Sequence, residues 1–277
     1  MTSLHRLKEE LKTSPLYLFS VGFVVLLVLL SLIAPLLPLD PNQTDVSQMN
    51  QGPSWEHWFG TDQVGRDYFI RVLYGGRISL LVGLLAMLAT VTIGSLVGIS
   101  AGYFGGRIDG VLMRLVDVLS SIPWLVLVIV LSVFLKPGLS TIVLVIGGFS
   151  WMSIARLLRA ETQSAKVYDY VVYARFIGVG PLQIIRRHIL PSILPMLIVA
   201  ASTSISSAIM TESALSFLGI GIQQPLASWG SLLQNAQSTL QSAPHMAILP
   251  GIFILLTIYS FNNIGDLIRD SLREEKE

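Results

Sequence analysis

The sequence between Tyr168 and Pro195 reads Y-D-Y-V-V-Y-A-R-F-I-G-V-G-P-L-Q-I-I-R-R-H-I-L-P-S-I-L-P, and it interrupts a chain that is otherwise mostly apolar. This segment is basic and is punctuated by glycine and proline. Three of its residues recur at the spacing of one helix face together with the residue just before the segment: Val167, Val171, Ala174 and Gly178. Gly180 and Pro181 then break the run. The pattern predicts two short helices around a turn, which together form a hairpin.

The remainder of the chain has the composition of an integral membrane protein. Hydrophobic residues make up 52% of the 277 residues and charged residues 13%, whereas a soluble domain has about 25% charged residues. Because backbone polar groups in lipid must be satisfied within a segment, we expect an all-α membrane protein of six helices, each near the roughly 20 residues that cross a bilayer. The hydrophobic stretches run from Leu16 to Leu37, Ile78 to Ala101, Val116 to Leu135, Leu139 to Ile154, Leu190 to Thr211 and Ala247 to Ile264.

These stretches and the basic residues predict the organisation of the chain. We expect a cytoplasmic segment over residues 1–15, a first transmembrane helix over 16–37, an outer loop over 38–77, a core membrane domain over 78–268 and a cytoplasmic tail over 269–277. The first stretch exceeds the roughly 7 to 15 apolar residues of a signal peptide, so we interpret it as a retained helix. Lys and Arg gather before it, between the second and third stretches, and around the hairpin at about 162–190. By the positive-inside rule these regions and both termini face the cytoplasm.

Three arginines run against that rule, because Arg66, Arg71 and Arg77 fall in the expected outer loop. Asp62 and Asp67 lie beside them in the sequence. We expect local ion pairs between these acids and the arginines.

Enzymatic function classes find no support in the sequence. The chain contains no G-x-x-x-x-G-K-[ST] phosphate loop, no H-E-x-x-H helix and no G-x-S-x-G elbow, and it has no cysteine. The net charge of +1 offers no reason to expect nucleic-acid binding. A protein of this kind that moves solute uphill must use ATP hydrolysed by a partner or an ion gradient. The absence of a clear inverted repeat favours the partner's ATP.

Polar residues within the predicted spans are candidates for lining a solute pathway. Glu212 is the main intramembrane carboxylate, and an ionisable residue inside the membrane is by default a candidate for a functional site. A structural hydrogen bond is the alternative for Glu212, helix packing is the alternative for the serines, and a pair with Arg114 is the alternative for Asp117. The candidates are Asp117, Ser206, Glu212 and Ser213.

Glycines recur every four residues in the second stretch, at Gly94, Gly98 and Gly102. This spacing predicts close contact with another helix. The contacting helix could belong to a partner protein or to the same chain.

The hairpin resembles the loop of the permease subunits of bacterial ABC importers, whose pattern is E-A-A, three residues, Gly, nine residues, then I-x-L-P. Here the pattern falls on Val172-Tyr173-Ala174, on Gly178 and on His188-Ile189-Leu190-Pro191, with Val172 and Tyr173 in place of Glu and the first Ala. Three further stretches resemble the "C" type permease of dipeptide, oligopeptide and nickel importers. They are His57 to Leu80, Met113 to Pro123, and Glu212 through Ser228-Trp229-Gly230 to Asp270.

The resemblance implies the six-helix transmembrane domain of a type I ABC importer, so that 78–268 would be the core permease domain in a bacterial plasma membrane. It also implies a peptide importer with a homologous second permease, two ATPase subunits that bind ATP and Mg, and an extracytoplasmic solute-binding protein. This chain would itself need no cofactor or metal and would bind no nucleic acid. The hairpin would form coupling helices that insert into the ATPase, with Ala174 and Gly178 as small residues at the contact. The site residues implied are Asp169, Ala174, Arg175, Gly178, Pro181, His188, Leu190 and Pro191.

Several alternatives stay open at this point. The hairpin could be an amphipathic segment that rests on anionic headgroups through its arginines. The solute could be nickel or a metal chelate. From other classes, the chain could be an ion-gradient-driven secondary carrier or an intramembrane enzyme.

Overall fold

The structure is a computed structural model that describes residues 9–11 and 14–273. Within these residues the regular structure is helical, and a single isolated β-bridge joins Thr61 to Asp67. The helices are α2 (Pro15–Ile33), α3 (Tyr68–Phe104), α4 (Gly106–Ser120), α5 (Trp124–Phe134), α6 (Leu139–Ala165), α7 (Asp169–Phe176), α8 (Pro181–Ile184), α9 (Leu190–Phe217), α10 (Trp229–Ala236) and α11 (His245–Arg273), with short 3-10 and π turns between some of them.

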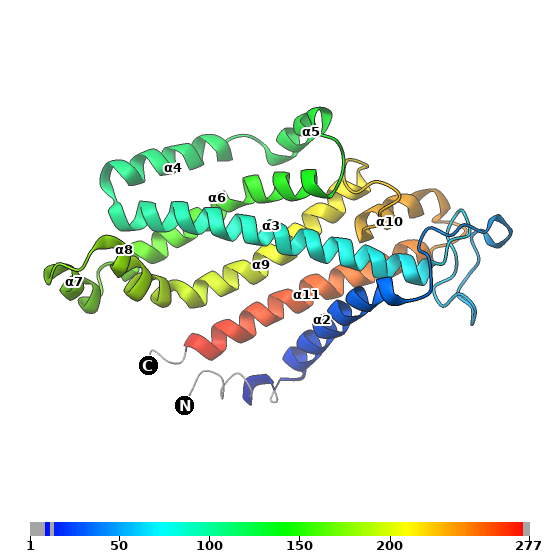
Figure 1. The fold of residues 1–277 in the computed structure, drawn as a ribbon, viewed down its shortest axis with the longest axis horizontal. Coiled ribbons are helices and arrows are strands. Elements are labelled where there is room, and N and C mark those ends of the chain that lie inside the picture. The colour runs from blue at the N-terminus through cyan, green and yellow to red at the C-terminus, as the bar shows by residue number, and fades with distance from the viewer. Residues whose placement is uncertain (1–8, 12–13, 274–277) are drawn as a thin grey trace.

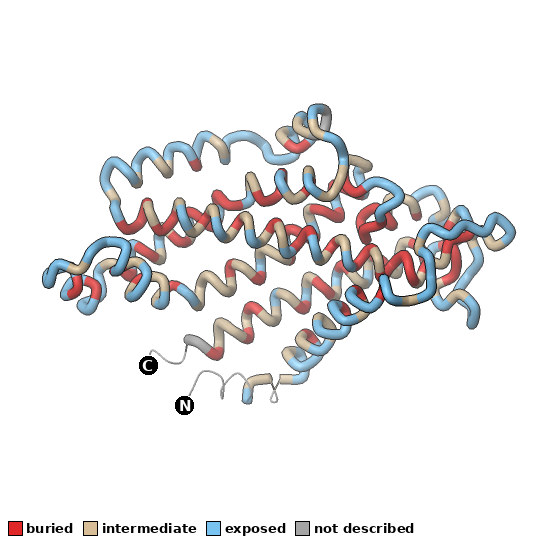
Figure 2. The backbone as a smooth tube through the Cα atoms, in the orientation of Figure 1, coloured by how far each residue is buried: buried red, intermediate tan, exposed pale blue. Residues whose placement is uncertain are grey.

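The long helices lie side by side and form one elongated bundle (Figure 1). Helix α3 packs against α6 and α9, and α11 packs against α9 and α2. The α7–α8 hairpin lies at one end of the bundle, while α10 and the long loop that precedes α3 lie at the other end (Figure 1). The first turn of α2 and the last turns of α11 are directed toward the hairpin end. Buried residues recur along the long helices of the bundle (Figure 2). Many large apolar side chains of these helices are nevertheless exposed.

Among the residues that the structure describes, five helices are long and apolar enough to cross a membrane, and a sixth span results if α4 and α5 count as one. The expected six-helix membrane domain is therefore confirmed, but its third span is not the continuous helix expected from Val116 to Leu135. Helices α4 and α5 meet at a bend of 74°. Pro123 explains the break, because its ring disfavours the helical conformation of Ile122 and it has no N–H to donate.

The second span begins ten residues earlier than the hydropathy predicts, so the outer loop ends at Asp67 and does not reach residue 77. Asp67 caps α3, since its Oδ1 accepts a hydrogen bond from the Ile70 amide at 3.1 Å. Arg71 and Arg77 fall in the first turns of this helix and dilute the apolar pattern there.

The expected pairing of outer-loop charges is present for two of the three arginines. The Arg66 Nε lies 2.6 Å from Asp62 Oδ2, and the Arg71 Nε lies 3.6 Å from the same oxygen. Arg71 is only 1% exposed, so Asp62 supplies the counter-charge for a buried cation. Asp67 instead pairs with His57, whose Nδ1 lies 2.7 Å from Asp67 Oδ2.

The regularly spaced glycines of α3 contact α6 of the same chain, which decides between the two alternatives. A Cβ added to Gly98 would lie 2.5 Å from the carbonyl oxygen of Ala155, and one added to Gly94 would lie 2.7 Å from the Cβ of Ile154. Gly102 meets Thr162 in the same way. The two helices therefore pack at a separation that only glycine permits.

Candidate functional site: the helical hairpin

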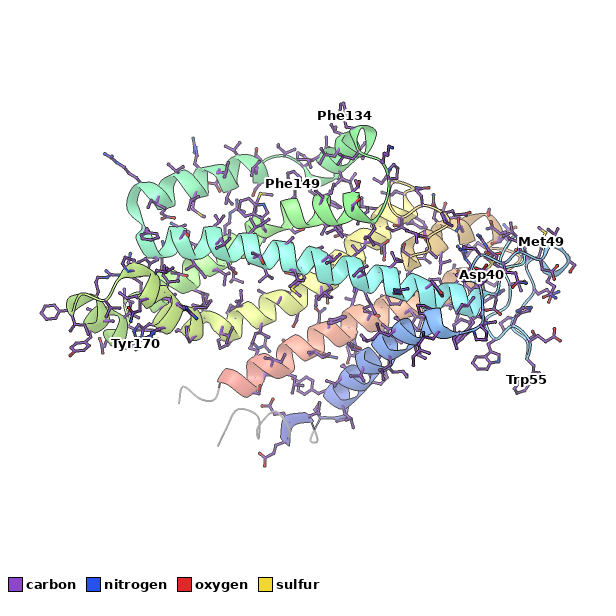
Figure 3. All side chains as sticks on the ribbon, in the orientation of Figure 1. Asp40, Met49, Trp55, Phe134, Phe149 and Tyr170 are labelled. Atoms are coloured by element: carbon purple, nitrogen blue, oxygen red, sulfur yellow. The ribbon has the colours of Figure 1, made fainter. Side chains whose placement is uncertain are left out.

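The predicted hairpin is formed by α7 and α8, which connect α6 to α9 at one end of the bundle (Figure 1). Tyr170 marks this end, and Trp55 and Met49 mark the opposite one (Figure 3). Asp169 lies in the first turn of α7 and Arg175 in its last turn. Each charge thus lies at the end of the helix where the dipole favours it.

Gly178 makes the turn between the two helices possible. Its φ is +84°, a left-handed conformation that glycine adopts without the steric cost other residues incur. The Gly178 amide donates to the Arg175 carbonyl at 3.1 Å, and the Val179 amide donates to the Ala174 carbonyl at 3.0 Å. This pair of bonds is the Schellman motif that ends a helix. Pro181 then occupies the first position of α8, where a missing N–H leaves no bond unmade.

The inner face of the hairpin packs on its own chain. Val171 and Ala174 are buried with Ile184 and Ile189 in one apolar cluster. Ala174 is 4% exposed, so its small side chain permits close packing inside this chain. The resemblance had instead implied that Ala174 contacts the ATPase. The expected common face of the segment is also shorter than predicted, because Val167 and Gly178 are exposed.

The outer face of the hairpin is exposed and apolar. Phe176 is 88% exposed and Leu182 is 79% exposed. Sequence reasoning overlooked both residues, although each lies on the helix side opposite the buried positions. Their neighbours Val172, Tyr173 and Ile177 are exposed as well.

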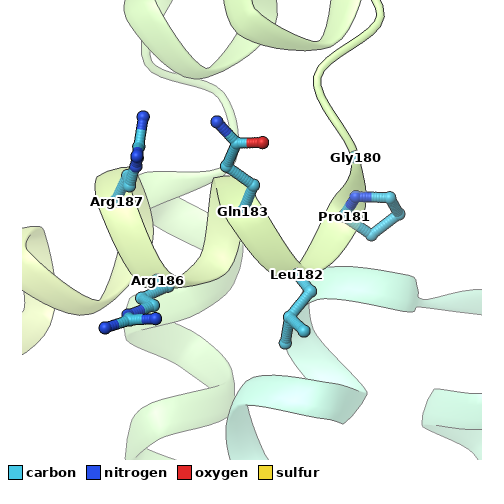
Figure 4. Close-up of a pocket in the computed structure, with 6 residues that line it drawn as sticks. All are labelled: Gly180, Pro181, Leu182, Gln183, Arg186 and Arg187. Atoms are coloured by element: carbon cyan, nitrogen blue, oxygen red, sulfur yellow. The ribbon is translucent and has the colours of Figure 1, made fainter.

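Two surface pockets flank the second half of the hairpin. The first has a volume of about 590 Å³, and Leu182 and Arg186 project to one side of its helix while Gln183 and Arg187 project to the other (Figure 4). The pocket is lined by Gly180, Pro181, Leu182, Gln183, Arg186 and Arg187.

The second pocket, of about 730 Å³, brings three of the predicted site residues together: Asp169, His188 and Pro191 line it with Tyr168, Tyr170, Arg187 and Ser192. The rings of Tyr170 and His188 lie 6.0 Å apart. Arg175 lies outside this pocket, with its guanidinium 5.7 Å from the centre of the Tyr103 ring. Leu190 is half-buried against the apolar cluster inside the hairpin.

The four pathway candidates do not converge on one site. Asp117 pairs with Arg156 of α6, with Nη2 and Oδ1 3.0 Å apart, and not with Arg114, the partner given as the structural alternative. The Ser206 hydroxyl lies 3.3 Å from the Ile258 carbonyl of α11. Ser213 and Glu212 are buried near the opposite end of α9. No group of three or more His, Cys, Asp or Glu side chains that could hold a metal ion occurs in the part of the chain that the structure describes.

Comparison with known proteins decides the family. Residues 94–274 match the family described as binding-protein-dependent transport system inner membrane component. The chain belongs to this family. Residues 5–53 match a second family, the N-terminal transmembrane domain of oligopeptide transport permease C.

Curated relatives of the chain are permease proteins of transport systems. A dipeptide transport system permease protein of Bacillus subtilis is 40% identical over 255 residues, which cover 91% of this chain and 80% of that protein. An oligopeptide transport system permease protein of Haemophilus influenzae is 42% identical over 231 residues, covering 83% and 74%. A glutathione transport system permease protein of Pectobacterium atrosepticum is 40% identical over 231 residues, covering 83% and 77%.

Among solved structures, the inward-facing MetNI methionine ABC transporter contains a chain of the same fold. The TM-score is 0.56 with 18% sequence identity, and the match covers 72% of this chain and 96% of that chain. At this identity the likeness establishes the fold alone. Fold and family together identify a multi-pass transmembrane permease subunit of an ABC importer that works with partner subunits, as the resemblance predicted.

Proposed function

We propose that this chain forms half of the membrane pathway of a peptide importer. A homologous second permease would form the other half, two ATPase subunits would bind ATP and Mg and hydrolyse ATP, and an extracytoplasmic binding protein would deliver the solute. The relatives described above are named for dipeptides, oligopeptides and glutathione. All three are peptides, which favours a peptide over the nickel alternative.

The exposed apolar face of the hairpin is the observation that carries the coupling role. Phe176 and Leu182 belong to the hairpin at the end of the bundle (Figure 1) and are more than three-quarters exposed, which is unfavourable in water unless a partner covers them. Arg175, Arg186 and Arg187 are exposed in the same segment of the chain and would attract an acidic partner surface. A segment that only rested on headgroups would need its apolar side turned toward the bilayer. The hairpin instead lies at the tip of the bundle (Figure 1), a place that favours contact with a partner beyond the membrane.

The hairpin connects directly to two spanning helices, α6 and α9. Its inner face packs in the apolar cluster that contains Val171, Ala174 and Ile184, so a displacement imposed on the outer face is carried to both helices as a rigid-body movement. We therefore assign Asp169, Arg175, Pro181, His188, Leu190 and Pro191 to the docking region, and Ala174 and Gly178 to its internal support.

The proposed orientation places the hairpin and both chain ends on the cytoplasmic side of a bacterial plasma membrane. Lys and Arg are concentrated at the hairpin end, as the positive-inside rule requires. The described start of α2 and end of α11 are directed toward the same end of the bundle (Figure 1). The long outer loop and α10 would then meet the binding protein.

Reconstitution tests this proposal. The chain is co-expressed with the proposed second permease, ATPase and binding-protein subunits, purified as a complex and placed in liposomes that contain ATP. We expect uptake of a labelled tripeptide, stimulated ATP hydrolysis and no uptake of free Ni²⁺. Peptide uptake by the isolated chain under a proton or sodium gradient, without an ATPase subunit, would contradict the proposal.

A further inference from the structure

Glu212 of α9 is a fully buried carboxylate at the end of the bundle opposite the hairpin. Its Oε2 accepts a hydrogen bond from the Ser79 hydroxyl of α3 at 2.9 Å, and its Oε1 accepts one from the Ser216 hydroxyl at 2.7 Å. No lysine or arginine among the described residues forms an ion pair with it. A buried carboxyl group is tolerated where hydrogen bonds satisfy its oxygens, and these two serine hydroxyls supply such bonds.

Each of these serines also accepts a hydrogen bond from the backbone of the segment that follows α9. The Trp229 amide donates to Ser79 Oγ at 3.2 Å, and the Ile222 amide donates to Ser216 Oγ at 3.0 Å. We call residues 218–236, which include α10, the outer cap. Two chains of hydrogen bonds thus run from Glu212 to two separate points of the outer cap. Hydrogen bonds in such chains polarise and strengthen one another.

The outer cap also lies backbone against backbone on α9. A Cβ added to Gly221 would lie 2.5 Å from Ser216 Cα, and one added to Gly230 would lie 2.5 Å from Ser213 Cα. The indole of Trp229 is fully buried, and its Nε1 donates to the Val72 carbonyl of α3 at 3.1 Å. The outer cap is therefore seated on both α3 and α9 around the carboxylate.

We infer that Glu212 is a positioning residue that fixes the outer cap to α3 and α9, and that it is not a solute ligand. Both of its oxygens are already occupied by serine hydroxyls, and none of its surface is exposed. The outer cap then moves together with the outer ends of α3 and α9 and presents one defined surface to the outside. The effect on transport rests on the proposed function, whereas the anchoring of the outer cap does not.

Cysteine labelling tests the anchor, because the chain contains no cysteine and a single introduced thiol reports without background. Ala227→Cys in the outer cap, where Ala227 is 5% exposed, is labelled with a water-soluble maleimide in lipid nanodiscs. We expect Glu212→Ala to increase the labelling rate about tenfold or more, the change that leaving a buried hydrogen-bonding group unpaired makes to an opening equilibrium. Glu212→Gln should label like the wild type, because its amide can still accept from one serine and donate to the other.

Two controls separate local release from general unfolding. Ala174→Cys, at the buried face of the hairpin, should label slowly in every variant. Ser204→Ala removes a hydroxyl that bonds only the Ala200 carbonyl of its own helix, and it should change neither rate. If Glu212→Ala does not fold, Ser79→Ala and Ser216→Ala each cut one chain of hydrogen bonds and carry the same test.

Three results would overturn the inference: unchanged labelling at residue 227 in Glu212→Ala and in both serine variants, equal acceleration at residues 174 and 227, or labelling of Glu212→Gln as fast as that of Glu212→Ala. In the reconstituted complex, a released outer cap should raise the binding-protein concentration for half-maximal ATP hydrolysis and leave the maximal rate unchanged. The labelling result stands even if no peptide is transported, so failure of the proposed function remains distinguishable.

Discussion

Replacing Gly178 by alanine tests whether the hairpin transmits movement as a formed structure. The φ of Gly178 is +84°, and an L-residue in the left-handed region costs about 1–2 kcal/mol. A Cβ added there meets no atom within 4 Å, so this cost arises from backbone strain and not from a clash. We therefore expect the opening of the turn to increase about 5- to 30-fold.

Hydrogen exchange measures this change directly. The amides of Gly178 and Val179 close the Schellman motif. Their exchange rates should increase by the same factor, provided that the opened turn closes again faster than its amides exchange with solvent. In the reconstituted complex, ATP hydrolysis stimulated by solute and binding protein should decrease, while binding of the solute-loaded binding protein at the opposite face should stay unchanged.

Gly180 supplies the matched control for this variant. A Cβ at Gly180 also meets nothing within 4 Å, but its φ is −64°, which alanine adopts without strain. Gly180→Ala should therefore exchange and couple like the wild type, and Gly178→Asn should retain more activity than Gly178→Ala because asparagine tolerates the left-handed region. Equal behaviour of Gly178→Ala and Gly180→Ala would refute the reasoning.

Three further substitutions test other parts of the structure. Gly98→Ala should destabilise the protein by about 1–3 kcal/mol because its Cβ would press on the α6 backbone. Thermal unfolding in detergent should show this loss as a lower midpoint temperature, whereas Gly110→Ala, whose Cβ meets no atom within 4 Å, should not lower that temperature. Asp62→Asn should cost about 3 kcal/mol by removing the counter-charge of buried Arg71, and an unchanged midpoint would contradict that pairing. Phe176→Ser should leave thermal stability unchanged because the ring is 88% exposed, but it should weaken retention of the ATPase subunits about tenfold in pull-down titrations if the ring is an anchor of the interface.

The sequence predicted the hairpin because its signals are local. Gly178, Gly180 and Pro181 act on the backbone within a few residues, and the helices on each side end or begin where these residues require it. Hydropathy predicted most of the spans for a similar reason, since each helix in lipid must satisfy its own hydrogen bonds. The start of α3 at Tyr68 was missed because charged residues in its first turns are paired or capped by the outer loop, which a hydropathy average does not register.

Sequence alone thus determined the class of protein, the number of spans and the place of the hairpin, because composition, periodicity and turn residues act along the chain. Only the tertiary structure decided which side of the hairpin is free, because Ala174 and Phe176 differ in what packs against them and not in local propensity. The same holds for Asp117, which pairs across to Arg156. It holds as well for Glu212, which is linked to the outer cap through Ser79 and Ser216 only after α3 and α9 have come together.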